Sequence, residues 1–69
     1  MYYVVGVLNF FDNELNLHII HASDAMSAVA SLFQGYDFSM CSSLEDMQNE
    51  LFNCDIVVNA IEIPVISVI

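Results

Sequence analysis

A chain of 69 residues has room for one domain, which we expect to be a single acidic α+β domain spanning residues 1–69. Its hydrophobic fraction of 58% exceeds what a core of this size can hide, so we expect a homodimer or a hydrophobic partner interface. Nine acidic residues with no Lys or Arg give a formal net charge of −9. This charge excludes direct binding to nucleic acid and attraction to an anionic membrane surface.

The segments without charge are too short to cross a membrane. The two longest cover residues 1–11 and 25–36, whereas a transmembrane helix needs about 18 apolar residues. The N-terminus also lacks the basic region of a signal peptide. Cys41 and Cys54 flank a predicted helix whose ends lie ~15 Å apart, which is too far for a disulfide. These features indicate a cytoplasmic protein with reduced thiols.

The N-terminal third predicts a β-hairpin. Residues 2–11 (YYVVGVLNFF) are β-branched and aromatic and apolar on both alternating faces, as in a central or doubly covered strand. Asp12 and Asn13 form a polar two-residue turn. In the second strand, residues 14–21, apolar and polar side chains alternate, so one face is expected in the core. The predicted core residues of this strand are Leu15, Leu17 and Ile19.

Two helices are predicted next. Ser23 is the expected N-cap of a helix over residues 24–34, and Ser42-x-x-Glu45 matches a capping box for a helix over residues 43–53. The apolar stripe of the first helix contains Ala25, Ala28, Val29, Leu32 and Phe33. The expected buried face of the second contains Leu44, Met47, Leu51 and Phe52.

The C-terminal segment predicts a third strand over residues 55–63, ended by Pro64. Residues 65–69 form either a short fourth strand or an apolar tail. The predicted fold is therefore α+β: a small antiparallel sheet of three or four strands with two helices on one face, in the order ββααβ(β).

The side chains that could carry chemistry do not form a catalytic pattern. His18 and His21 point to opposite faces of a strand, and a zinc site would have to join them to Cys41 and Cys54 from separate segments. The serines stand at helix starts and in loops, and no nucleophile elbow or glycine-rich phosphate loop is present. We expect no enzyme activity, no cofactor and no metal.

The acidic residues are spread over the predicted elements at exposed positions. On the second helix Asp46 and Glu50 are like-charged i, i+4 neighbours, which costs roughly 0.2–0.5 kcal/mol. Glu50 also lies near the helix C-terminus, where a negative charge is unfavourable. The charge alone has two interpretations, a solubility device and a surface for a basic partner. The retained acids favour the second.

In size, charge and spread of acids, the whole chain resembles the small acidic phage-encoded inhibitors, a class that includes anti-CRISPR and anti-restriction proteins. The resemblance rests on no motif. It implies a stoichiometric inhibitor in the host cytoplasm that mimics nucleic acid and binds the basic nucleic-acid-binding surface of a host protein or effector complex. The implied partner-binding residues are Asp12, Glu14, Glu45, Asp46 and Glu50. The higher apolar fraction and fewer acids than in the extreme members predict a hydrophobic contact or homodimer interface as well.

The alternative is a hydrophobic assembly or oligomerisation module. In this interpretation the strand within residues 1–11 or the tail 65–69 adds to the sheet edge of another chain, and the charge only maintains solubility.

Overall fold

The computed structural model of the protein describes residues 1–64, so the predicted fourth strand or tail at 65–69 lies outside the described residues. The described part contains three strands and two helices. In chain order they are β1 (Tyr2–Asn9), β2 (Glu14–His21), α1 (Ala25–Leu32), α2 (Leu44–Phe52) and β3 (Ile56–Ile63). The strands form an antiparallel sheet in the order β2-β1-β3. The predicted α+β class is confirmed.

β1 is the central strand, as its apolar pattern predicts, but the hairpin turn is longer than expected. β1 ends at Asn9 and β2 begins at Glu14, so four residues rather than two connect them. The Asn9 side-chain oxygen accepts the backbone N–H groups of Phe11 and Asp12 at 3.0 and 3.2 Å. Asn13 has φ 55°, in the left-handed region that Asn tolerates.

The N-cap of each helix lies one residue later than predicted. Asp24, not Ser23, caps α1, and its Oδ1 accepts the Ser27 N–H at 2.7 Å. Ser43, not Ser42, caps α2, and its Oγ accepts the Asp46 N–H at 3.2 Å. The predicted capping box does not form, because the Asp46 side chain accepts from Ser42, the residue before the cap, and not from Ser43. Neighbouring polar residues offer the same capping chemistry, and only the backbone direction selects between them.

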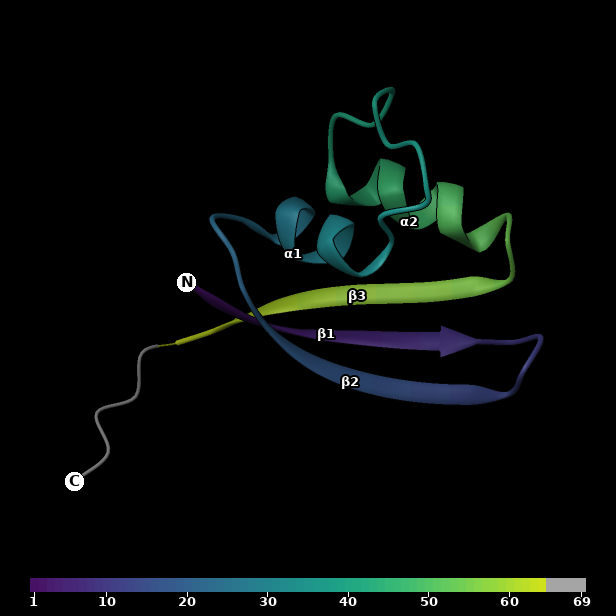
Figure 1. The fold of residues 1–69 in the computed structure, drawn as a ribbon, viewed down its shortest axis with the longest axis horizontal. Helices are drawn as coiled ribbons and strands as arrows, with labels where there is room; N and C mark the ends of the chain where they lie inside the picture. Colours follow the sequence, from purple (N-terminus) through teal and green to yellow (C-terminus); the bar gives the residue numbers. More distant parts are fainter. Residues whose placement is uncertain (65–69) are drawn as a thin grey trace.

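The core lies between the helices and one face of the sheet, and Figure 1 shows both helices above β3 with β2 farthest from them. The helices contact β1 and β3. Fully or nearly fully buried side chains come from both layers. They are Tyr3, Val5, Ala28, Val29, Met47, Leu51, Ile56 and Val58.

Two expectations about burial are wrong. The apolar residues of β2 do not face the core: Leu15, Leu17 and Ile19 are about 70% exposed on the helix-free face. The alternation of apolar and polar residues in β2 does divide the strand into two faces. It does not show which of the two faces the helices cover, and they cover the other one. Phe52 in the last turn of α2 is 59% exposed, whereas its neighbour Leu51 is fully buried.

The two edges of the sheet differ. On β3 the Gln48 side chain donates to the Val58 carbonyl at 2.9 Å, and the Asn59 side chain accepts the Ala60 N–H at 2.9 Å. These side chains satisfy outward-pointing backbone groups and so obstruct strand addition there. In residues 1–64 no side chain bonds the outer edge of β2. β1 has both edges paired, so the expectation that it adds to another sheet is wrong.

Candidate functional site

The predicted hairpin acids lie at one end of the sheet. Asp12 is in the turn, and Glu14 opens β2 opposite Asn9. Both are exposed. The Phe10 N–H donates to the Asp55 carbonyl at 2.9 Å, which brings the start of β3 to the same end. The exposed Asp55 therefore belongs to this group as well, which the sequence does not indicate because only the strand pairing reveals it.

The three predicted acids of α2 differ in their surroundings. Glu45 and Glu50 are exposed, whereas Asp46 is half-buried. Asp46 Oδ2 accepts both the backbone N–H and the hydroxyl of Ser42 at 2.9 Å. These hydrogen bonds hold the pKa of the Asp46 carboxyl below its usual value. Asp46 is thus acidic for a local reason, helix capping, and its retention argues less for recognition than the sequence suggested.

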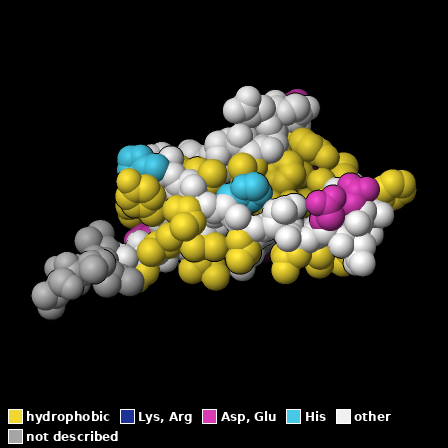
Figure 2. Space-filling view, turned by 60° about the horizontal axis from the view of Figure 1, so that its bottom comes forward, with side chains coloured by type: hydrophobic (Ala, Val, Ile, Leu, Met, Phe, Trp, Pro, Cys, Tyr) yellow, Lys and Arg dark blue, Asp and Glu magenta, His cyan; other side chains and the backbone are white. Residues whose placement is uncertain are grey.

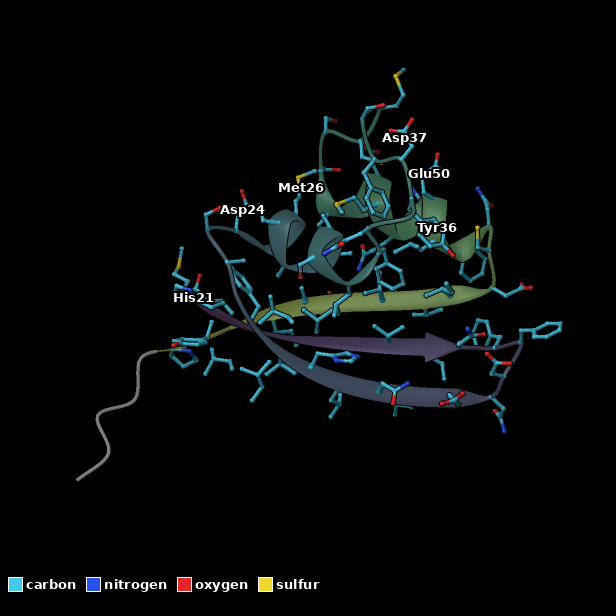
Figure 3. The ribbon with its side chains drawn as sticks, in the orientation of Figure 1. His21, Asp24, Met26, Tyr36, Asp37 and Glu50 are labelled. Atoms are coloured by element: carbon cyan, nitrogen blue, oxygen red, sulfur yellow. The ribbon has the colours of Figure 1, made fainter. Side chains whose placement is uncertain are left out.

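The predicted acids of α2 are joined by one more carboxylate near Cys41. Burial raises the pKa of the Cys41 thiol, and the carboxylates of Glu50, Asp46 and Asp37 raise it further, in that order of effect. Figure 3 shows Asp37 and Glu50 on the helix side, away from the sheet. Asp37 comes from the loop before α2, so it was not among the predicted site residues. We call Asp37, Asp46 and Glu50, with Glu45, the α2 acidic group.

The loop that carries Asp37 is held by aromatic contacts and a local turn. Tyr36 packs edge-on against Phe33, with ring centroids 5.6 Å apart, and stacks on Phe38 at 6.1 Å. Asp37 accepts the Ser39 N–H at 2.9 Å, which lowers the pKa of its carboxyl. The aromatic contacts and the turn therefore order the loop that brings Asp37 near Cys41.

Two further acids lie near the N-terminal end of β1. The pKa of the Tyr3 hydroxyl is raised by its burial first, then by the nearby Glu62 and Asp24 carboxylates. Asp24 has a lowered pKa because it accepts the Ser27 N–H as the cap of α1. The acids therefore surround the helix layer and the sheet ends rather than form one continuous surface.

The helix-free side of the sheet has the opposite character, and we call it the open face. It is formed by the even-numbered residues of β1 and the odd-numbered residues of β2 and β3, and no acidic residue is among them. Figure 2 shows hydrophobic side chains along this side, with acidic side chains only near its ends. The most exposed apolar members, 38–71% exposed, are Tyr2, Leu15, Leu17, Ile19, Val57 and Ile61.

The apolar content of the sequence predicts a hydrophobic interface, but the sequence does not place it on the open face. Residues 2–8 are apolar at both odd and even positions, so both faces of β1 favour burial. The two helices have eight and nine residues, and they lie on the same side of the sheet. One helix layer can cover only one of the two faces.

The histidines and cysteines are separated. β2 directs His18 toward the helix side and His21 to the open face, where its ring lies 4.8 Å from that of Tyr2. Cys41 and Cys54 are free thiols. Within residues 1–64 no three His, Cys, Asp or Glu side chains gather as a metal-binding group. In the same range there is no helix of sufficient length and apolarity to traverse a lipid bilayer.

Comparison with known proteins gives no relative to guide the assignment. No family model, no curated protein and no solved structure matches this chain.

Proposed function

We propose that this protein is a non-catalytic, stoichiometric inhibitor that binds the basic nucleic-acid-binding surface of a host protein or effector complex and competes with nucleic acid. The observation that carries the proposal is the distribution of charge. Nine acids without one Lys or Arg leave the open face free of carboxylates and are displayed around the helix layer and the sheet ends. Eight of the nine are exposed, and Asp46 is half-buried.

The binding surface in this proposal is the α2 acidic group, with the hairpin acids Asp12 and Glu14 as a second contact. Carboxylates held on a folded scaffold present a basic partner with separated negative charges, as a phosphate backbone does. Hydrogen bonds from Ser39 and Ser42 hold Asp37 and Asp46 in place, which lowers the cost of ordering these two charges on binding. Attraction between opposite charges speeds association and makes it sensitive to salt.

The experiment is capture from a nuclease-treated host lysate on the immobilised chain at about 50 and about 500 mM salt. We expect nucleic-acid-handling proteins to be retained at low salt, released at high salt and eluted by added DNA or RNA. The double variant Glu45→Lys/Glu50→Lys reverses two exposed charges without removing the Asp46 cap, and it should abolish capture. Each single variant, Glu45→Lys and Glu50→Lys, should weaken capture, whereas the control Glu62→Lys, with the same change in net charge as either one, should retain most of it. Capture that neither salt nor the double variant weakens would show that the proposal is wrong.

The second candidate function is the hydrophobic assembly module, and the open face is the observation that favours it. Here the carboxylates maintain the solubility of a chain with one uncovered apolar sheet face. The captured partner would then survive high salt and would be lost on substitution in the open face instead.

A further inference from the structure

We propose that the open face is a homodimer interface on which a second copy of this chain packs face to face. The proposal gives the second candidate function a surface and a partner. It does not require the carboxylates to bind a basic protein, so the two proposals can fail separately.

The size of the apolar surface fits a dimer. Six side chains of the open face are 38–71% exposed. If each leaves about 100 Å² in water, the six together offer on the order of 600 Å² per copy. Two copies then bury roughly 1,200 Å², the lower bound of a specific interface, before the half-buried Val4, Leu8 and Ile63 are included. This area is at the upper end of the largest apolar patch on a typical monomer, and such patches are often functional.

The absence of charged residues from the open face favours a second copy of this chain over a charged partner. The open face has no carboxylate with which to bind a cation, and its polar members are His21 and Asn59. It therefore matches another uncharged apolar surface, and a two-fold axis supplies one of the same size and shape. Leu17 lies over Gly6, with its Cδ2 3.3 Å from where a Cβ would stand, so this side chain fills the centre of the face.

The charge of each copy permits this packing. Two chains of −9 repel each other, but face-to-face sheets place both helix layers on the outside. With layers spaced by about 10 Å, the acids of the two helix layers stand about 30 Å apart, several Debye lengths at 0.15 M salt. The acids at the sheet ends come closer together, and salt screens their repulsion. The dimer should therefore tighten as salt rises, whereas binding of a basic partner should weaken.

Pairing along the free edge of β2 is the competing geometry. The Ala22 N–H donates to the Met1 carbonyl at 2.9 Å, which fixes the alternation of the ladder. It follows that the backbone N–H and C=O groups of Leu15, Leu17 and Ile19 point outward from the β2 edge. The side chains of the same three residues lie on the open face. Ile61 separates the two geometries, because it lies on β3 at the far side of the sheet. Face packing buries Ile61, and edge pairing at β2 does not.

The test is analytical ultracentrifugation of the full chain at about 100 µM in about 0.15 M salt. We expect a particle of about twice the 7.7 kDa chain mass. Ile61→Glu should raise the dimer dissociation constant about 100-fold or more, since each dimer then buries two charges. Met40→Glu adds the same charge at a loop residue that is 91% exposed, and it should remain dimeric. Circular dichroism verifies the fold of each variant, and Ile61→Thr, a neutral strand-forming substitution, should weaken the dimer about tenfold.

Three results would overturn the proposal. The first is a monomeric wild-type chain. The second is a dimer that Ile61→Glu leaves intact while hydrogen exchange shows newly protected amides at Leu17 and Ile19, since this assigns the contact to the β2 edge. The third is loss of the dimer on deletion of residues 65–69, which assigns it to that segment. Because Ile61→Glu changes no carboxylate of the α2 acidic group, capture of a basic partner should survive it.

Discussion

The placement of the α2 carboxylates depends on which side of the helix faces the sheet, and two adjacent residues test it. Leu51 is fully buried and Phe52 is 59% exposed. Leu51→Ala removes three heavy atoms from a packed site and should cost about 2–5 kcal/mol. A domain of this length has a total stability of about 3–10 kcal/mol, so the loss is a large part of it. Phe52→Ala removes a larger side chain that is mostly in water and should cost under about 1 kcal/mol.

The assay is urea unfolding followed by circular dichroism at one protein concentration, because dimerisation makes stability depend on concentration. If Leu51→Ala unfolds the chain in buffer, Leu51→Val, with a cost of about 1 kcal/mol, keeps the comparison measurable. Equal losses at the two positions, or a larger loss at Phe52, would contradict this orientation of α2 and with it the outward display of its acids.

Ser43→Ala should lower the free energy of unfolding by about 1 kcal/mol and the melting temperature by roughly 4–8 °C, because Ser43 is the N-cap of α2. Ser42→Ala should have a smaller effect, and equal shifts in melting temperature would place the cap elsewhere. The pKa of Cys41, measured by the pH dependence of thiol alkylation in a chain without the other cysteine, should fall in Glu50→Gln and stay unchanged in Glu45→Gln, since only the first carboxylate acts on the thiol. Asp24, Asp37 and Asp46 accept backbone N–H groups, and the pKa of each carboxyl is below its usual value. Their contribution to stability is therefore present above about pH 4 and is lost as the pH falls through the lowered pKa values. In urea unfolding at about pH 6 and pH 2.5, the free energy of unfolding of the wild type should exceed that of the triple Asp→Asn variant by less at the lower pH. A difference that grows in acid would contradict the lowered pKa values.

The local part of the fold could be predicted from the sequence. The apolar run of β1 identified the central strand, and the heptad-like spacing of Ala25, Ala28 and Val29 identified the inner side of α1. The strand bounds differ from expectation by at most two residues. These features follow from side-chain periodicity, which acts over neighbouring turns and does not depend on the rest of the molecule.

The relation between the elements could not be predicted in the same way. The alternation of side chains in β2 defines two faces, but which face is buried depends on where the helices pack. The short helices contact β1 and β3 rather than β2. For the same reason, the approach of Asp55 to the hairpin and of Asp37 to Glu50 is a property of tertiary structure. Among the predicted site residues, Asp46 acquired a capping role that only the hydrogen bonds reveal.

Competition between the displayed carboxylates and nucleic acid can be measured by titration. A captured partner is loaded with fluorescently labelled DNA or RNA, and the chain is added while the anisotropy is followed. We expect complete release at a simple fixed ratio of chain to partner, with Glu45→Lys/Glu50→Lys inactive and Glu62→Lys retaining most of the effect of the wild type. A stable ternary complex of partner, nucleic acid and chain would contradict it.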